Sequence, residues 1–235
     1  YIGSHTVVEL QKNGYDVIIA DNLVNSSLEV LDGIEKITGI RPEFEEIDLT
    51  DGEVTRDFFA RHSDIRAVIH FAALKAVGES VSKPLEYYFN NLNSLMNVLT
   101  CMREFKVPNL VFSSSCTVYG QADVLPVTEK TPRHEAESPY GNTKVMSEDI
   151  IRDLMRVEPD MKALALRYFN PIGAHPTAFI GELPNGVPNN LIPYLTQTAI
   201  GIREQLSVFG DDYNTPDGSP CLLYTSPSPR DMRRS

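Results

Sequence analysis

Short apolar runs along the chain alternate with segments of helical periodicity. Five runs predict buried strands, at residues 16–20, 42–49, 66–74, 108–115 and 162–170. Helical patterns cover residues 4–13, 27–38, 53–62, 84–105 and 139–156, and Gly14 follows the first of them as helix C-caps prefer. Strands that are apolar on both faces and alternate with helices are typical of a parallel sheet covered on both sides. The pattern therefore predicts an α/β fold with a doubly wound parallel sheet.

The composition of the sequence changes after Asn170. Proline and glycine become frequent, and the regular alternation of strands and helices stops. We expect residues 1–170 to form the sheet-bearing domain and residues 171–218 to begin a second, substrate-facing region.

Composition narrows the class of protein without assigning a function. The chain has 235 residues, of which 42% are hydrophobic, and it contains no apolar run long enough to span a membrane. Its start is already amphipathic, so we expect no signal peptide. A formal net charge of −11 argues against a nucleic-acid-binding surface. Three scattered cysteines and five histidines without metal-ligand spacing favour a reduced, cytoplasmic setting and no metal.

Polar residues at strand ends are the first candidates for binding. Doubly wound sheets bind ligands at the carboxyl ends of their strands. Asp21 and Asn22 end the first predicted strand, where a dinucleotide fold places the acid that accepts hydrogen bonds from a ribose. Counting back about 20 residues reaches Gly3, which would be the last glycine of the phosphate-binding turn. A packing glycine and a capping aspartate are the alternative.

Tyr140 and Lys144 form a sharper motif because residues four apart share one face of a helix. A tyrosine is a poor base at neutral pH, but a nearby ammonium favours the phenolate. Such a pair can take a proton from an alcohol while a hydride leaves for a nicotinamide. Ser115, at the end of a strand, can bond the same oxygen. A surface Tyr–Lys pair and a strand-end serine are the alternatives.

Several other polar residues are weaker candidates. Lys75 follows a strand end with small residues, and Asn90 interrupts a predicted helix, where asparagine is unfavourable. Asn170 and Asn190 lie near loops, where amides suit sugar hydroxyls and phosphates. A solvated lysine, an exposed asparagine and ordinary turns are the alternatives.

Eight blocks, in this order, carry a resemblance to a known family: YIGSH, DNL, HFAALKAVGES, FSSSCTVYG, SPYGNTK, LRYFNPIGAHP, GVPNNLIPY and FGDDY. Together they resemble the nucleotide-sugar 4-epimerases of the extended short-chain dehydrogenase/reductase family over about residues 1–218. The resemblance implies a Rossmann-type NAD-binding fold. It also implies the interconversion of UDP-glucose and UDP-galactose through a 4-keto sugar, with bound NAD and a homodimer pairing residues 84–105 and 139–156.

The resemblance also implies a role for individual residues. The catalytic positions are Ser115, Tyr140 and Lys144. The cofactor positions are Tyr1, Ile2, Gly3, Asp21, Asn22, Leu23, Val24, Asn25, Ser26, Asp48, Leu49, Phe71, Ala72, Ala73, Leu74, Lys75, Asn90 and Phe169. The substrate positions are Asn170, Asn190, Ser207, Val208 and Phe209. No metal is implied.

Two other functions are weighed against this one. The related 4,6-dehydratases carry an Asp-Glu pair shortly after the position of Ser115, where this chain has Cys116 and Thr117. A non-catalytic NAD-binding scaffold would be expected to lose the Ser/Tyr/Lys trio, and all three residues are present.

Both ends of the chain depart from the family pattern. The family reads a glycine-rich turn before Tyr-Ile-Gly-Ser-His, so we expect the first central strand to be absent and the sheet to be interrupted there. At the other end, CLLYTSPSPRD resembles a translated sequencing adapter, and we interpret residues 219–235 as foreign. A natural disordered tail is the alternative. We expect residues 1–235 alone to be inactive.

Overall fold

The computed structural model describes residues 1–188, 190–207 and 218. Within them the strands are β1 (Ile18–Asp21), β2 (Glu43–Glu46), β3 (Ala67–His70), β4 (Asn109–Ser115) and β5 (Lys162–Tyr168). The helices are α1 (Ile2–Lys12), α2 (Glu29–Thr38), α3 (Gly52–Arg61), α4 (Val77–Ser82), α5 (Pro84–Glu104), α6 (Pro139–Val157) and α7 (Leu191–Ala199), with a 3-10 turn, η1 (Cys116–Tyr119). Among these helices, none is both long and apolar enough to cross a membrane.

The strands form two parallel sheets, with the orders β1-β2 and β3-β4-β5. Ile18 of β1 lies opposite Glu43 of β2, and Ser114 of β4 lies opposite Arg167 of β5. Across the described residues, no strand hydrogen-bonds to both sheets, so one edge of β1 and one edge of β3 have no ladder partner. The α/β class and the parallel pairing are as predicted.

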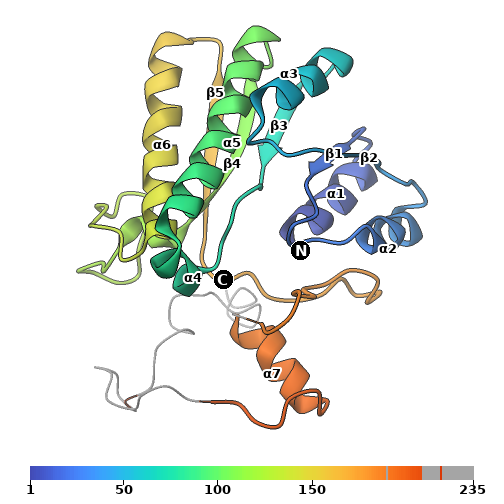
Figure 1. Cartoon of the computed structure of the whole chain (residues 1–235), viewed down its shortest axis with the longest axis vertical. Coiled ribbons are helices and arrows are strands. Elements are labelled where there is room, and N and C mark those ends of the chain that lie inside the picture. The colour runs from blue at the N-terminus through green and yellow to red at the C-terminus, as the bar shows by residue number, and fades with distance from the viewer. Residues whose placement is uncertain (189, 208–217, 219–235) are drawn as a thin grey trace.

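The larger core lies between the three-stranded sheet and the helices that cover it. Figure 1 shows α5 and α6 side by side over β4. Leu95 and Leu99 of α5 are buried in one cluster with Phe59 of α3 and with Leu110 and Phe112 of β4. This burial fixes α5 and α6 against the end of β4, where the candidate site lies.

A smaller core joins α1 and α2 to the loop that follows β5. Val8 and Ile34 are fully buried, and Ile180 from that loop packs against them. Gly33 of α2 permits this contact, because a Cβ atom there would lie 2.4 Å from the carbonyl oxygen of Phe179. The segment after residue 170 therefore packs back onto the first part of the chain.

Some element boundaries differ from the sequence expectation. The first helix begins at Ile2 rather than at residue 4, and Val7, Val8 and Gln11 are among its buried residues. The first strand runs from Ile18 to Asp21 instead of over residues 16–20. Helices α4 and α7 were not predicted, because both are short and lie in segments rich in loop-forming residues.

Candidate active site

Ser115, Tyr140 and Lys144 are brought together where the end of β4 meets the start of α6. Ser115 is buried and its Oγ accepts a hydrogen bond from the Thr117 backbone amide (3.2 Å), which begins the η1 turn. Lys144 is 4% exposed, and its Nζ donates to the carbonyl oxygen of Ser113 (2.8 Å). The same Nζ lies 5.8 Å from the centroid of the Tyr140 ring. The predicted sharing of one helix face by Tyr140 and Lys144 is therefore confirmed.

Burial controls how these groups ionise. It raises the pKa of Tyr140, which the neighbouring Ser115 hydroxyl lowers by a smaller effect and the Cys116 thiol raises further. Burial also lowers the pKa of Lys144 to about 8. The expected lowering of the Tyr140 pKa by the Lys144 ammonium is absent from these effects. Lys144 loses its proton near pH 8, below the range in which the buried Tyr140 phenol titrates, so no ammonium is present there to favour the phenolate.

A buried histidine completes the surroundings of Lys144. His70, at the end of β3, is 4% exposed and its ring stacks on Phe112 with centroids 6.1 Å apart. Burial, aided by the Lys144 charge, lowers the pKa of His70 to about 3, so its imidazole is neutral at neutral pH. Sequence reasoning did not select His70, because a histidine within an apolar strand is indistinguishable from a core residue.

A cleft at the carboxyl ends of β1, β2 and β3 collects most of the predicted cofactor residues. Predicted residues that line it are Asp21, Asn22, Val24, Asn25, Asp48, Leu49, Ala72, Ala73, Leu74 and Asn90. Ala20, Ile47, Thr50 and Ser94 also line it and were not predicted. The cleft therefore joins the two sheets and α5 at the edge where doubly wound folds bind their ligands.

Asp21 organises the loop on one side of this cleft. Its Oδ1 accepts hydrogen bonds from the Leu23 amide (2.7 Å) and the Ser26 hydroxyl (2.6 Å). Leu23 has φ of 58°, a left-handed conformation that is uncommon for a bulky residue. Both bonds fall on Oδ1, and Asp21 Oδ2 accepts none from the described residues. The carboxylate can therefore shape its loop and still accept hydrogen bonds from a ligand.

The remaining predicted cofactor residues do not line the cleft. Tyr1 is the N-cap of α1, with Ile2 and Gly3 in the first turn. A Cβ atom on Gly3 would lie 3.7 Å from the Phe71 ring, so the start of α1 faces the segment after β3. Two more predicted residues lie outside the cleft lining: Lys75, which is exposed with its Nζ 3.8 Å from Glu182, and Phe169, which is partly buried just after β5.

Asn91 is a site-shaping residue that the sequence reasoning missed. It is 4% exposed; its Oδ1 accepts from the Leu74 amide (2.8 Å) and its Nδ2 donates to the Leu74 carbonyl (3.0 Å). The same Nδ2 donates to Thr143 Oγ1 (3.1 Å) on α6. Asn91 thus clamps the loop after β3 to α6, and Asn90 donates to its Oδ1 (3.0 Å). The argument that singled out Asn90 in the helix applies equally to Asn91.

The predicted substrate residues are not bonded to the Ser/Tyr/Lys trio. Asn170, Asn190 and Ser207 are all exposed, and among the described residues no hydrogen bond links them to the trio. The Asn190 side chain donates to Glu182, so Glu182 stands near both this residue and Lys75. Val208 and Phe209 lie outside the described residues, as do all of residues 219–235.

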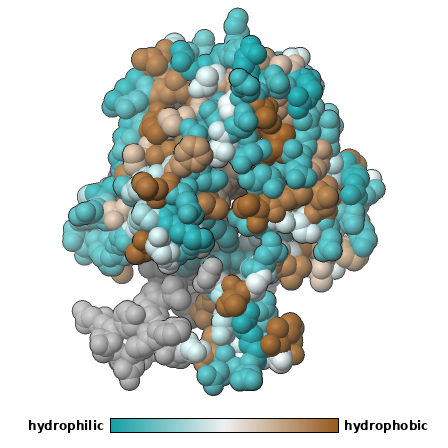
Figure 2. All heavy atoms as spheres, in the orientation of Figure 1, coloured by the Kyte–Doolittle hydropathy of each residue, from teal (hydrophilic) through white to brown (hydrophobic). Residues whose placement is uncertain are grey.

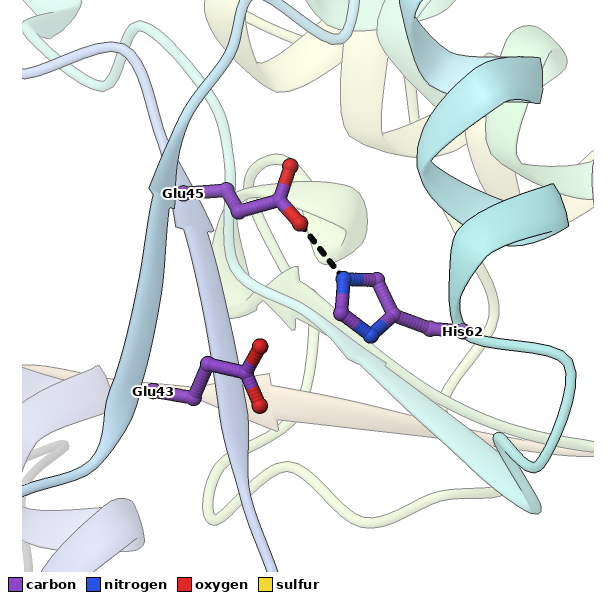
Figure 3. A group of neighbouring side chains, drawn as sticks. All are labelled: Glu43, Glu45 and His62. Carbon is purple, nitrogen blue, oxygen red and sulfur yellow. Dashed lines mark hydrogen bonds and ion pairs between the residues drawn. The ribbon is translucent and has the colours of Figure 1, made fainter.

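One group of surface side chains has metal-ligand chemistry, and it lies away from the cleft lining. Figure 3 shows Glu43 and Glu45 on β2 beside His62, which follows α3, with their ligand atoms within 4.8 Å of one another. Glu45 is already engaged, because it accepts hydrogen bonds from His62 (2.5 Å) and from Arg61. The guanidinium neutralises the carboxylate that a cation would need, so the group is an ion-pair cluster joining β2 to α3.

Comparison with known proteins places this geometry in a family. The sequence profile described as "NAD dependent epimerase/dehydratase family" matches residues 1–217. A UDP-glucose 4-epimerase of Dictyostelium discoideum is 52% identical over 93% of this chain and 63% of its own length. A crystal structure of the Bifidobacterium longum UDP-glucose 4-epimerase in complex with NAD⁺ and UDP superposes with a TM-score of 0.90 at 47% identity. The Stenotrophomonas maltophila enzyme with bound NAD and a formylated UDP-arabinopyranose has a TM-score of 0.87 at 47% identity.

The matches cover only part of the length of the relatives. The two structures are covered over 65% and 64% of their length, and each match takes in 93% of this chain. The chain therefore spans just under two thirds of these proteins. Because the family profile covers nearly the whole chain and the predicted catalytic residues converge at one strand end, the chain belongs to the NAD-dependent epimerase/dehydratase family.

Proposed function

We propose that the full-length protein containing this chain is a UDP-glucose 4-epimerase, which interconverts UDP-glucose and UDP-galactose with bound NAD⁺. The observation that carries the proposal is the convergence of Ser115, Tyr140 and Lys144 where the end of β4 meets α6. Relatives that bear this name are 51–53% identical to the chain. The activity of the whole protein, its substrates and its assembly are parts of the proposal.

The cleft fits a dinucleotide by the chemistry of its lining. The Asp21 carboxylate keeps one oxygen for a ribose hydroxyl, and small residues at Ala72 and Ala73 let a ligand approach the backbone. Asp48 and Asn90 add polar groups to the lining. When bound there, NAD⁺ supplies a centre that accepts a hydride from the sugar and returns it.

The residues of this chain supply the proton transfer. In the phenolate form, which burial disfavours and the Ser115 hydroxyl favours, Tyr140 takes the proton of the sugar 4-hydroxyl, and Ser115 hydrogen-bonds the same oxygen. Lys144 holds a positive charge behind the pair at pH values below about 8, where its amine is protonated. Return of the proton from Tyr140 then completes either epimer, since the 4-keto sugar presents either face to the site.

The geometry favours epimerisation over dehydration. Elimination of water needs an additional acid and base beside the sugar, and the residues after Ser115 are Cys116 and Thr117. Burial raises the pKa of the Cys116 thiol, which makes it a poor acid or base partner at neutral pH. A dehydratase remains the second candidate, and assays for 4-keto-6-deoxy products distinguish it.

Replacement of Tyr140 tests the proposed chemistry. In the full-length protein, Tyr140→Phe should retain bound NAD⁺ and lose turnover by roughly 10²–10⁴-fold, because it removes the proton acceptor. The measurement is conversion of UDP-galactose with the cofactor content quantified in the same sample. Tyr15→Phe, at a surface residue 63% exposed, is the matched control. Near-normal turnover of Tyr140→Phe would overturn the assignment.

We also propose that the full-length protein pairs as a homodimer through α5 and α6. Leu85, Phe89 and Met96 of α5 and Met146 of α6 are exposed apolar side chains. Figure 2 shows apolar side chains on the face where Figure 1 places these helices. Leu95 and Leu99 of the same helix are buried in the core, so the exposed apolar residues form a separate face of α5.

Sedimentation of the full-length protein tests the dimer. We expect a dimer, and we expect Phe89→Glu combined with Met96→Glu to produce monomers because charges would enter an apolar contact. A wild-type protein that sediments only as a monomer would contradict the proposal.

A further inference from the structure

The last residues of β4 are joined to α6 at three successive points. The Ser113 carbonyl oxygen accepts from Lys144, and the Ser115 hydroxyl neighbours Tyr140. Between them, Ser114 is joined to a third residue of α6, Glu148. Tyr140, Lys144 and Glu148 are spaced four apart, so they lie along one face of the helix. The proposed chemistry uses the first two of these contacts and leaves the third without a role.

Glu148 binds the ends of two strands at once. Its Oε1 accepts hydrogen bonds from Ser114 Oγ (2.6 Å) and from Arg167 Nε (2.9 Å), and its Oε2 accepts from Arg167 Nη2 (2.7 Å). Arg167 lies on β5 directly opposite Ser114 in the strand register. One carboxylate, itself 7% exposed, therefore ties β4 and β5 to α6. The fork-like pairing with Arg167 fixes its orientation as well as its position.

The loop before α6 adds a second guanidinium. Arg133 Nη1 lies 3.7 Å from Glu148 Oε2, and it is buried without a hydrogen-bond partner among the described residues. The other arm of Arg133 donates to Asp149 (2.7 Å). A buried ion pair of this kind is rarely more stable than apolar residues of similar size, so stability alone does not account for it. Its specific property is the fixed geometry that it imposes at the end of β4.

We propose that Glu148 is a positioning residue that holds the Tyr140 and Lys144 face of α6 against the end of β4. It does so through Ser114, the residue next to Ser115, and so keeps the Ser115 hydroxyl in contact with Tyr140. Its effect on turnover rests on the epimerase function proposed above. Its effect on the ionisation of Tyr140 does not depend on that function.

The direction in which the Tyr140 pKa changes in a variant distinguishes loss of positioning from loss of charge. The groups facing Tyr140 are Ser115 from β4, Cys116 from η1, Lys144 from α6 and Tyr87 from α5. Loss of the Ser115 contact raises the Tyr140 pKa, because that hydroxyl lowers it. Loss of the Glu148 negative charge alone would act in the opposite direction, because a nearby negative charge disfavours the phenolate. A rise of the Tyr140 pKa both in Ser114→Ala, which keeps the Glu148 charge, and in Glu148→Gln, which removes it, therefore identifies a positioning role.

The experiment compares three variants of the full-length holoenzyme. Glu148→Gln removes the charge, and Ser114→Ala removes only the link between Glu148 and β4. Asp153→Asn is the control, because Asp153 lies on the same helix in an exposed ion pair with Arg156. Turnover, KM for UDP-galactose and NAD content are measured together. The Tyr140 titration is followed by NMR of carbon-13-labelled tyrosine, with Tyr140→Phe assigning the signal.

We expect kcat to fall roughly 10- to 100-fold in Glu148→Gln and Ser114→Ala, while KM and NAD content change less than about 2-fold. The Tyr140 titration midpoint should rise by about one pH unit in both, and the control should match the wild type. An unchanged Tyr140 titration in Ser114→Ala overturns the inference, whatever happens to stability. If Glu148→Gln does not fold, Ser114→Ala still decides. If the wild type has no epimerase activity, the proposed function fails while the titration still decides the role of Glu148.

Discussion

Lys144 carries its ammonium in a setting that disfavours the charge. Burial lowers its pKa to about 8, whereas an unfolded chain holds the proton up to a pKa of 10.5. As the pH rises from about 8 to 10.5, the folded protein gives up this proton before the unfolded protein does. The unfolded state then binds more protons, so the contribution of Lys144 to stability becomes more favourable as the pH increases.

This sign gives a prediction for the cofactor-free full-length protein. The free energy of unfolding of the wild type, relative to Lys144→Met, should increase by about 3 kcal/mol between pH 7 and pH 10.5. Urea denaturation at a series of pH values measures the difference, in which other titrating groups cancel. Lys130→Met, at an exposed lysine, controls for the loss of a surface charge. A difference that stays constant with pH would show that Lys144 is not buried as described.

Residue-level predictions succeeded where local spacing decides the outcome. The four-residue interval between Tyr140 and Lys144 places them on one helix face whatever packs against it. The pKa of Tyr140 was predicted in the wrong direction, because the sequence does not show how much water the fold excludes. Asn91 and Glu148 were missed for a related reason. Their roles come from partners on other elements, at Leu74 and Arg167, which no local pattern reveals.

At the scale of elements, Gly33 shows how one missing side chain lets two segments meet. A Cβ atom there would lie 2.4 Å from the Phe179 carbonyl oxygen and 2.8 Å from Ile180 Cγ2. Backbone atoms cannot move away as a flexible side chain can. The contact holds the loop that contains Glu182, and hence the surroundings of Lys75 and Asn190, against α2.

We therefore predict that Gly33→Ala destabilises the full-length protein. The overlap should cost about 1–3 kcal/mol, which exceeds the gain of up to about 1 kcal/mol from the better helix propensity of alanine. Gly78→Ala in α4 is the matched control, because its Cβ would meet nothing within 4 Å, and it should be neutral or slightly stabilising. Urea denaturation measures both. Equal effects of the two substitutions would mean that the loop does not pack on α2.

The sequence predicted the type of an element correctly where that element buries a regular set of apolar residues. The long helix predicted for residues 84–105 is α5, and the apolar run at residues 108–115 contains β4. Helix α7 was missed because a pattern of Pro and Gly around residues 183–193 resembles a loop. Its sequence carries only one buried residue, Pro193, so no apolar face identified it.

At the scale of the whole molecule, the cofactor cleft depends on how two separate sheets sit together. One wall comes from Asp21 and its loop, and another from residues 72–74 after β3. No ladder hydrogen bond among the described residues joins β1 to β3. Side-chain packing and the bond from Asn97 to the Leu49 carbonyl (2.9 Å) hold the walls in place instead. Parallel pairing was predictable from the alternation of elements, but the strength of this junction was not.

The open strand edges lead to a prediction for residues 1–235 expressed alone. Two unpaired edges expose backbone donors and acceptors, which favour association with other chains. A typical domain has a free energy of unfolding of only about 5–15 kcal/mol, so a cleft held by side-chain packing is easily disrupted. We expect weak NAD⁺ binding and no epimerase turnover from this chain, because binding requires both walls at the correct separation.

Calorimetry with NAD⁺ and a coupled assay with UDP-galactose test this expectation, with the full-length protein measured in parallel. If the full-length protein binds NAD⁺ and turns over while residues 1–235 do neither, the expectation for this chain is met. The junction can then be probed inside the full-length protein. There, Asn97→Ala should weaken NAD⁺ binding, because it removes the bond to the Leu49 carbonyl that helps to hold the two walls. Micromolar NAD⁺ binding with turnover by residues 1–235 would contradict the argument, since packing between the two sheets would then suffice to build the site.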